Sequence, residues 1–111
     1  MYDTIPISKE LVPYVFSIKL AGEMFEIRVD YNSVGDTFVL SLWKDNELVC
    51  AGEPVIYGVP LWKDVYKAGK FPAVDIIPID ASGETSKVTY DNLGRTVVLA
   101  LDNREVSILN E

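Results

Sequence analysis

The stretch Phe25-Glu26-Ile27-Arg28-Val29-Asp30-Tyr31 decides the fold class, because apolar and charged residues alternate along it without interruption. Successive side chains of a β-strand point to opposite faces, so the four apolar residues share one face and the three charged residues share the other. The segment therefore predicts a strand with one buried and one solvated face.

The sequence on either side of this strand shows the same period and extends it into a meander. The expected inward residues are Phe16, Ile18 and Leu20, then Phe38, Leu40 and Leu42, then Leu48 and Cys50. Turn-forming residues separate these stretches at 21–23, 32–36 and 44–46. Four short strands at about ten-residue spacing predict an all-β fold, either a small barrel or a sandwich, built on a four-stranded antiparallel meander.

The middle of the chain breaks this regularity, since prolines and glycines recur between Gly52 and Pro60. Residues 61–66 allow at most one short helix. A later strand begins near Val74, and Pro78 confines it to a sheet edge or marks the end of the strand. The β-branched stretch 96–101 predicts a final, central strand.

The 111 residues suit one β domain over 1–111. Residues 1–12 are expected as an N-terminal arm and residues 102–111 as a C-terminal tail. No stretch is apolar over the length that crosses a bilayer, and the N-terminus lacks a secretory signal, so no membrane association is expected.

The composition excludes much of catalytic chemistry. Histidine is absent and Cys50 is the single cysteine, which leaves no Ser-His or Cys-His pair and no Cys/His zinc site. Glu26 and Asp30 share one strand face, where solvated carboxylates are far commoner than an acid-base pair. We therefore expect no enzyme, no catalytic residue, no metal and no cofactor.

The net charge of −7, from 17 acidic and 10 basic residues, opposes nucleic-acid binding, because such affinity comes from neutralising phosphates with lysine and arginine. Solubility alone also accounts for a charge of this sign and size.

One group of apolar residues falls on the face opposite the expected core. Val39, Trp43 and Val49 lie there with Val15, and exposed apolar groups of this kind mark interfaces. Tyr57 and Trp62, in the middle segment, are expected to add to this candidate partner interface, since Trp and Tyr are favoured anchors. The alternative is that both sheet faces are buried within the domain.

The order and spacing of these elements resemble a known family. The matching residues are Tyr31-Asn32, Phe38-x-Leu40-x-Leu42, Leu48-x-x-x-Gly52-x-Pro54-Val55-x-x-Gly58-x-x-Leu61, Asn92-Leu93-Gly94 and Val97-Val98-Leu99, with Ile5-Pro6-Ile7 as a short arm. They are similar to the baseplate plug proteins of contractile-tailed bacteriophages and prophages. The segment 79–90 and the residues after Leu101 depart from that pattern.

The resemblance implies a structural protein of the virion tail baseplate, made in the cytoplasm of the host bacterium. Plug proteins of this kind lie at the distal end of the tail tube, so hub and spike proteins are the expected partners, and a homo-oligomer is expected as well. An acidic tube lining would repel DNA phosphates and ease passage; this hypothesis fails if charge reversal of lumen-facing acids leaves DNA ejection unchanged.

A different class of function remains open from the residues alone. Trp43, Trp62 and Tyr57 would suit a free-standing binding module that stacks carbohydrate rings on aromatic side chains. A titration of tryptophan fluorescence with glycans, compared with mixing with a hub protein, distinguishes the two hypotheses.

Overall fold

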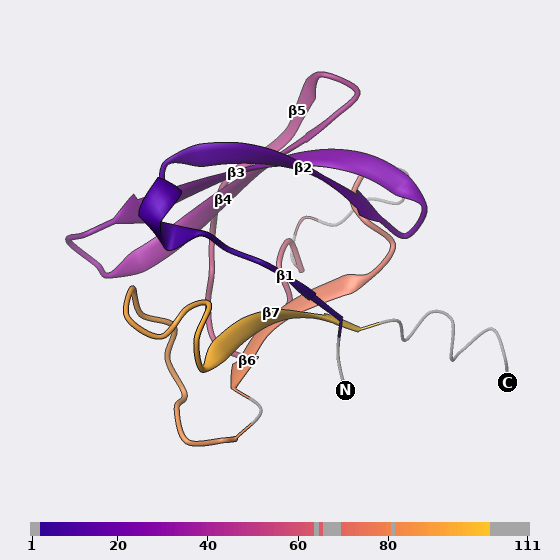
Figure 1. Ribbon diagram of the computed structural model, residues 1–111. Coiled ribbons are helices and arrows are strands. Elements are labelled where there is room, and N and C mark those ends of the chain that lie inside the picture. The colour runs from indigo at the N-terminus through magenta and orange to yellow at the C-terminus, as the bar shows by residue number, and fades with distance from the viewer. Residues whose placement is uncertain (1–2, 64, 66–69, 81, 103–111) are drawn as a thin grey trace, which may run out of the picture.

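The computed structural model describes residues 3–63, 65, 70–80 and 82–102. Its strands are β1 (Asp3–Ile5), β2 (Tyr14–Leu20), β3 (Glu23–Asn32), β4 (Thr37–Lys44), β5 (Glu47–Pro54), β6 (Asp75–Asp80) and β7 (Val97–Asp102), with a 3-10 helix η1 (Lys9–Leu11). They form two antiparallel sheets, ordered β2-β3-β4-β5 and β1-β7-β6, which lie as two layers (Figure 1). The sheets do not close into a barrel, so the sandwich alternative is the one the chain adopts.

Two tight hairpins hold the four-stranded sheet in register. The β2–β3 turn has φ of 51° at Ala21 and 84° at Gly22, and the β4–β5 turn has φ of 53° at Asp45 and 66° at Asn46. Positive φ at both central residues is the geometry of a type I′ turn, whose twist matches that of the flanking strands. The predicted meander is therefore confirmed, strand by strand.

The direction of the Leu48 side chain on β5 differs from the prediction. The β4–β5 ladder shifts register between Leu40 and Leu42 and again between Leu42 and Trp43. These irregularities place Leu48 opposite Trp43, where its side chain is 55% exposed, instead of on the inward face. A β-bulge adds a residue to one strand and so reverses the alternation of side chains beyond it.

The core lies between the sheets. The four-stranded sheet contributes the apolar residues that alternation predicted on β3 and β4, from Phe25 to Leu42. Val97 and Leu99 on β7, Ile76 on β6 and Ile5 on β1 meet them from the second sheet. Val55, Leu61, Trp62, Phe71 and Leu93 close the core from the connecting segments.

The second sheet places β7 at its centre and β6 at an edge, as the sequence predicted from its β-branched run and from Pro78. Part of the segment expected to form an arm lies in this sheet: β1 pairs with β7, with Thr4 opposite Ala100. The predicted C-terminal tail lies outside the described residues, apart from Asp102 at the end of β7.

The short helix allowed over 61–66 is not formed in the described part of that segment. Leu61–Lys63 and Val65 lie in turns, whereas Asp64 and Tyr66 are outside the described residues. Trp62 has φ of 60°, a left-handed conformation that an α-helix does not accept. Tertiary burial of this tryptophan therefore outweighs the local preference for a helical turn.

Candidate partner interface

The solvent-facing side of the four-stranded sheet, here called the outer face, carries an apolar group around Trp43. On β4, Trp43 and Val39 both point away from the core and are partly exposed. Trp43 lies opposite Leu48 of β5 and Glu26 of β3. Val15, on β2, is 51% exposed. The outer face thus carries apolar residues on β2, β4 and β5, with the charged residues Glu26, Arg28 and Asp30 of β3 between them.

Trp43 lies between two shallow hollows on this face. Val15, Arg28 and Asn46 line one hollow of about 320 Å³ together with Trp43 and Glu26. A second hollow of about 240 Å³ also contacts Trp43, and its lining includes Met24. An aromatic side chain that borders two depressions and has polar neighbours matches the anchors found at protein interfaces.

Two charged residues on this face, Arg28 and Asp30, form an ion pair. Arg28 Nε donates hydrogen bonds to the Asp30 carboxylate, with 2.9 Å to Oδ2, and this side-chain hydrogen bond raises the pKa of Arg28. Lys44 forms an ion pair with Glu23 on the opposite side of the sheet, where Lys44 Nζ lies 5.6 Å from the centroid of the buried Phe25 ring. Both pairs are at least partly exposed, so each contributes little to stability, and the Arg28–Asp30 pair gives the outer face a polar border.

The other predicted interface residues lie elsewhere. Val49, in the irregular part of β5, packs against the core cluster. Tyr57 is partly buried, and its hydroxyl accepts a hydrogen bond from the Asp80 backbone N–H at 3.1 Å. Trp62 is buried, with 2% of its surface exposed. Of the five residues proposed from the sequence, the structure places Val39 and Trp43 on the outer face, at separate positions along β4.

This distribution bears on the carbohydrate hypothesis. Trp62 packs against Phe71, with ring centroids 6.0 Å apart, inside the core. Its indole Nε1 is buried and has no hydrogen-bond partner among the residues that the structure describes. Trp43, Tyr57 and Trp62 therefore do not form one aromatic platform.

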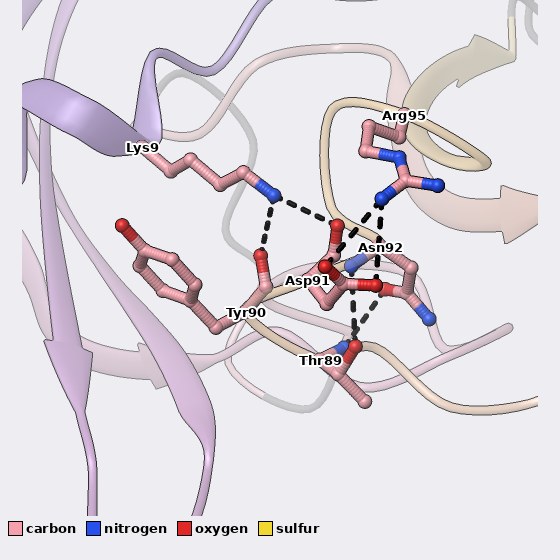
Figure 2. A network of polar contacts seen from close by, with 6 residues as sticks. All are labelled: Lys9, Thr89, Tyr90, Asp91, Asn92 and Arg95. Atoms are coloured by element: carbon pink, nitrogen blue, oxygen red, sulfur yellow. Dashed lines mark hydrogen bonds and ion pairs between the residues drawn. The ribbon is translucent and has the colours of Figure 1, made fainter.

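A polar network fastens the long segment between β6 and β7 to the N-terminal part of the chain (Figure 2). Lys9 Nζ donates to the carbonyls of Tyr90 and Asp91, at 2.7 and 2.8 Å, and lies 5.2 Å from the centroid of the Tyr90 ring. Asn92 and Thr89 exchange backbone-to-side-chain hydrogen bonds of 2.9 and 3.2 Å. These local bonds stabilise a turn.

Tyr90 also joins this segment to the meander. Its ring packs on Phe38 and Tyr31, at centroid distances of 5.8 and 5.0 Å. Asp36 accepts from the Tyr31 hydroxyl at 2.6 Å and from the Tyr90 backbone N–H at 2.9 Å. The first of these bonds is the main cause of a lowered pKa of Asp36 and a raised pKa of Tyr31.

Asp80, at the end of β6, organises the turn that follows. Its carboxylate accepts hydrogen bonds from the backbone N–H and hydroxyl groups of both Ser82 and Thr85, at 2.6 to 3.1 Å. These bonds, led by the Ser82 hydroxyl, lower the pKa of Asp80 to about 2. These hydrogen bonds explain why a carboxylate can be buried at this position.

Two exposed apolar residues of the outer face, Met24 and Leu48, were not predicted as interface residues. Met24, 56% exposed, follows from the alternation that buries Phe25 and was therefore accessible to pattern analysis. Leu48 depends on the bulges in β5, for which Gly52 is the sole local signal.

No group of three or more metal-ligating side chains gathers among the described residues. Within the same residues, no helix has the length and apolarity to cross a membrane.

Comparison with known families adds the decisive observation. The model of the family described as cyanophage baseplate Pam3 plug gp18 matches residues 2–104. The chain belongs to this baseplate plug family. The match includes every strand and the outer face, so the all-β sandwich described above is that of a phage baseplate structural protein. No curated protein matches the sequence.

Proposed function

We propose that this baseplate plug protein acts by protein-protein assembly with the hub and spike proteins at the distal end of the phage tail tube. The family match over residues 2–104 is the observation that carries the proposal. The protein would be synthesised in the host bacterial cytoplasm and function in the assembled virion.

The outer face supports this proposal as the contact surface. Trp43 and Val39 are apolar and partly exposed, and the charged residues Glu26 and Asp30 lie opposite them on β3, the composition expected of interface anchors with polar neighbours. Burial of a tryptophan against a partner is among the largest single contributions at such interfaces.

The test is binding of the purified plug to the hub and spike proteins of the same tail. Trp43→Ala should weaken the affinity by roughly 30-fold, as expected for an interface anchor worth about 2 kcal/mol. Val34→Ala is the matched control, because Val34 is 96% exposed but lies in the β3–β4 loop.

If the wild-type protein binds neither hub nor spike, the proposed partners are wrong. If it binds and both variants bind equally well, assembly stands but the outer face is not the surface. The carbohydrate-binding alternative has no observation in its favour, since its three aromatic side chains are separated.

A further inference from the structure

The edges of the two sheets differ in how they are protected from pairing with other chains. An unprotected edge presents free backbone N–H and C=O groups to any additional strand, so soluble proteins usually block it. The β6 edge is blocked by the loop before it: Gly58 N–H donates to Pro78 O at 2.8 Å and Leu61 N–H to Ile76 O at 2.9 Å.

The remaining edges of the second sheet and of the meander also differ. On β5, two register shifts, Pro54 and the charges of Glu47 and Glu53 make the edge irregular. The edge strand β1 has three residues. In contrast, β2 has seven residues, contains no proline and pairs with β3 in an unbroken register from Tyr14 to Leu20.

The turn geometry identifies which β2 groups are free. A two-residue type I′ turn makes Leu20 and Glu23 a hydrogen-bonded pair, and such pairs then alternate along the hairpin. The backbone groups of Val15, Ser17 and Lys19 therefore point away from β3. None of them forms a hydrogen bond with another described residue.

We infer that the β2 edge pairs with the β2 edge of a second copy of this chain, forming one continuous eight-stranded sheet across a two-fold axis at Ser17. In this antiparallel arrangement all seven residues overlap, with Ser17 opposite its own counterpart, Phe16 opposite Ile18 and Val15 opposite Lys19. The pairing forms about six new backbone hydrogen bonds.

Charge and packing favour a second copy as the occupant. Lys19 is the one charged residue between Leu11 and Gly22 in a chain of net charge −7, so two acidic proteins meet at their least charged edge. Lys19 faces Val15 and not another lysine, which avoids the penalty for like charges on opposing strands. Phe16 and Ile18, partly exposed on the core side, become an aromatic and β-branched cross-strand pair.

The inference names a surface for self-association and does not depend on the hub and spike contacts proposed above. The experiment is light scattering with size-exclusion chromatography on the full chain at a series of concentrations. Ser17→Pro removes the N–H at the two-fold axis of both copies and leaves the β2–β3 ladder intact, because this N–H points away from β3. The dimer should weaken by roughly tenfold or more with the loss of these two hydrogen bonds.

Two further variants separate the possible causes. Ser17→Ala keeps the N–H and should remain dimeric. Ser17→Lys keeps the N–H but places two lysines opposite each other, so it should weaken pairing with a second copy specifically. Circular dichroism and thermal unfolding verify that each variant is folded.

Amide hydrogen exchange provides an independent measurement. Val15, Ser17 and Lys19 amides should be protected in the dimer and exchange rapidly on dilution. A wild-type monomer at every concentration, or dimers unaffected by both Ser17→Pro and Ser17→Lys, would overturn the inference. Protection that arises solely on mixing with another tail protein would also overturn it, because the occupant would then be a foreign strand.

Discussion

The two sheets bury a common core but are assembled from different parts of the chain. The four-stranded sheet joins consecutive strands through short connections, whereas the second sheet pairs β1 at the N-terminus with β7 near residue 100. Long-range pairing closes a large loop and costs more conformational entropy than a hairpin. The meander is therefore the part that local sequence can build, and the second sheet depends on the meander being present.

The largest effect is expected from Phe38→Ala in the centre of the meander. Phe38 is fully buried and its ring packs on Tyr31 and Tyr90, so the variant should lose about 3–5 kcal/mol of unfolding free energy. Urea unfolding measures this loss. Val39→Ala, the next residue on the opposite face, should cost about 1 kcal/mol; equal losses for both variants would contradict the assigned faces.

Ile5→Ala tests the second sheet and should cost about 2–3 kcal/mol, because Ile5 is 3% exposed but belongs to a short edge strand. Amide exchange should accelerate in β1 and β7 more than in β3 and β4. Thr4→Ala, on the other face of β1, is the control. Uniform acceleration in both sheets would show that they unfold as a single unit and would remove the distinction between them.

Lys9→Met tests how much the hydrogen bonds between the N-terminal segment and the 82–96 segment contribute to stability. It removes two hydrogen bonds to the carbonyls of Tyr90 and Asp91, and we expect a loss of about 1 kcal/mol. Chemical unfolding provides the measurement, with Lys63→Met as a control at an exposed lysine. If the two variants are equally stable, the network in Figure 2 contributes nothing measurable.

The smallest effect is expected from Asp80 and appears in acid. Its pKa is lowered from the usual 3.8 to about 2, so its stabilising contribution is complete above about pH 4 and is lost as the pH falls through about 2. Thermal unfolding of Asp80→Asn should therefore show a weaker decline between these pH values than the wild-type protein. Asp45→Asn, in the β4–β5 turn, should retain the full decline; a retained decline in Asp80→Asn would contradict the role of these hydrogen bonds.

Whether a candidate interface residue could be predicted depends on the regularity of the segment that carries it. Trp43 and Val39 were predictable, because they alternate with the buried Phe38, Leu40 and Leu42 on a regular strand. Trp62 was not, since an aromatic residue between Pro60 and Gly69 has no period from which its direction can be inferred. Val49 and Leu48 were each assigned to the wrong face of β5, because a bulge cannot be located from alternation alone.

The sequence by itself determined the all-β class, the meander with its inward residues, the central position of β7 and the edge position of β6. Those properties follow from a two-residue period, from turn residues and from the missing N–H of Pro78, all of which act locally. Tertiary structure alone decided that two open sheets form instead of a barrel, that residues 3–5 join β7, and that Trp62 enters the core. Those outcomes depend on packing between segments far apart in the chain, and no local pattern specifies which surfaces meet.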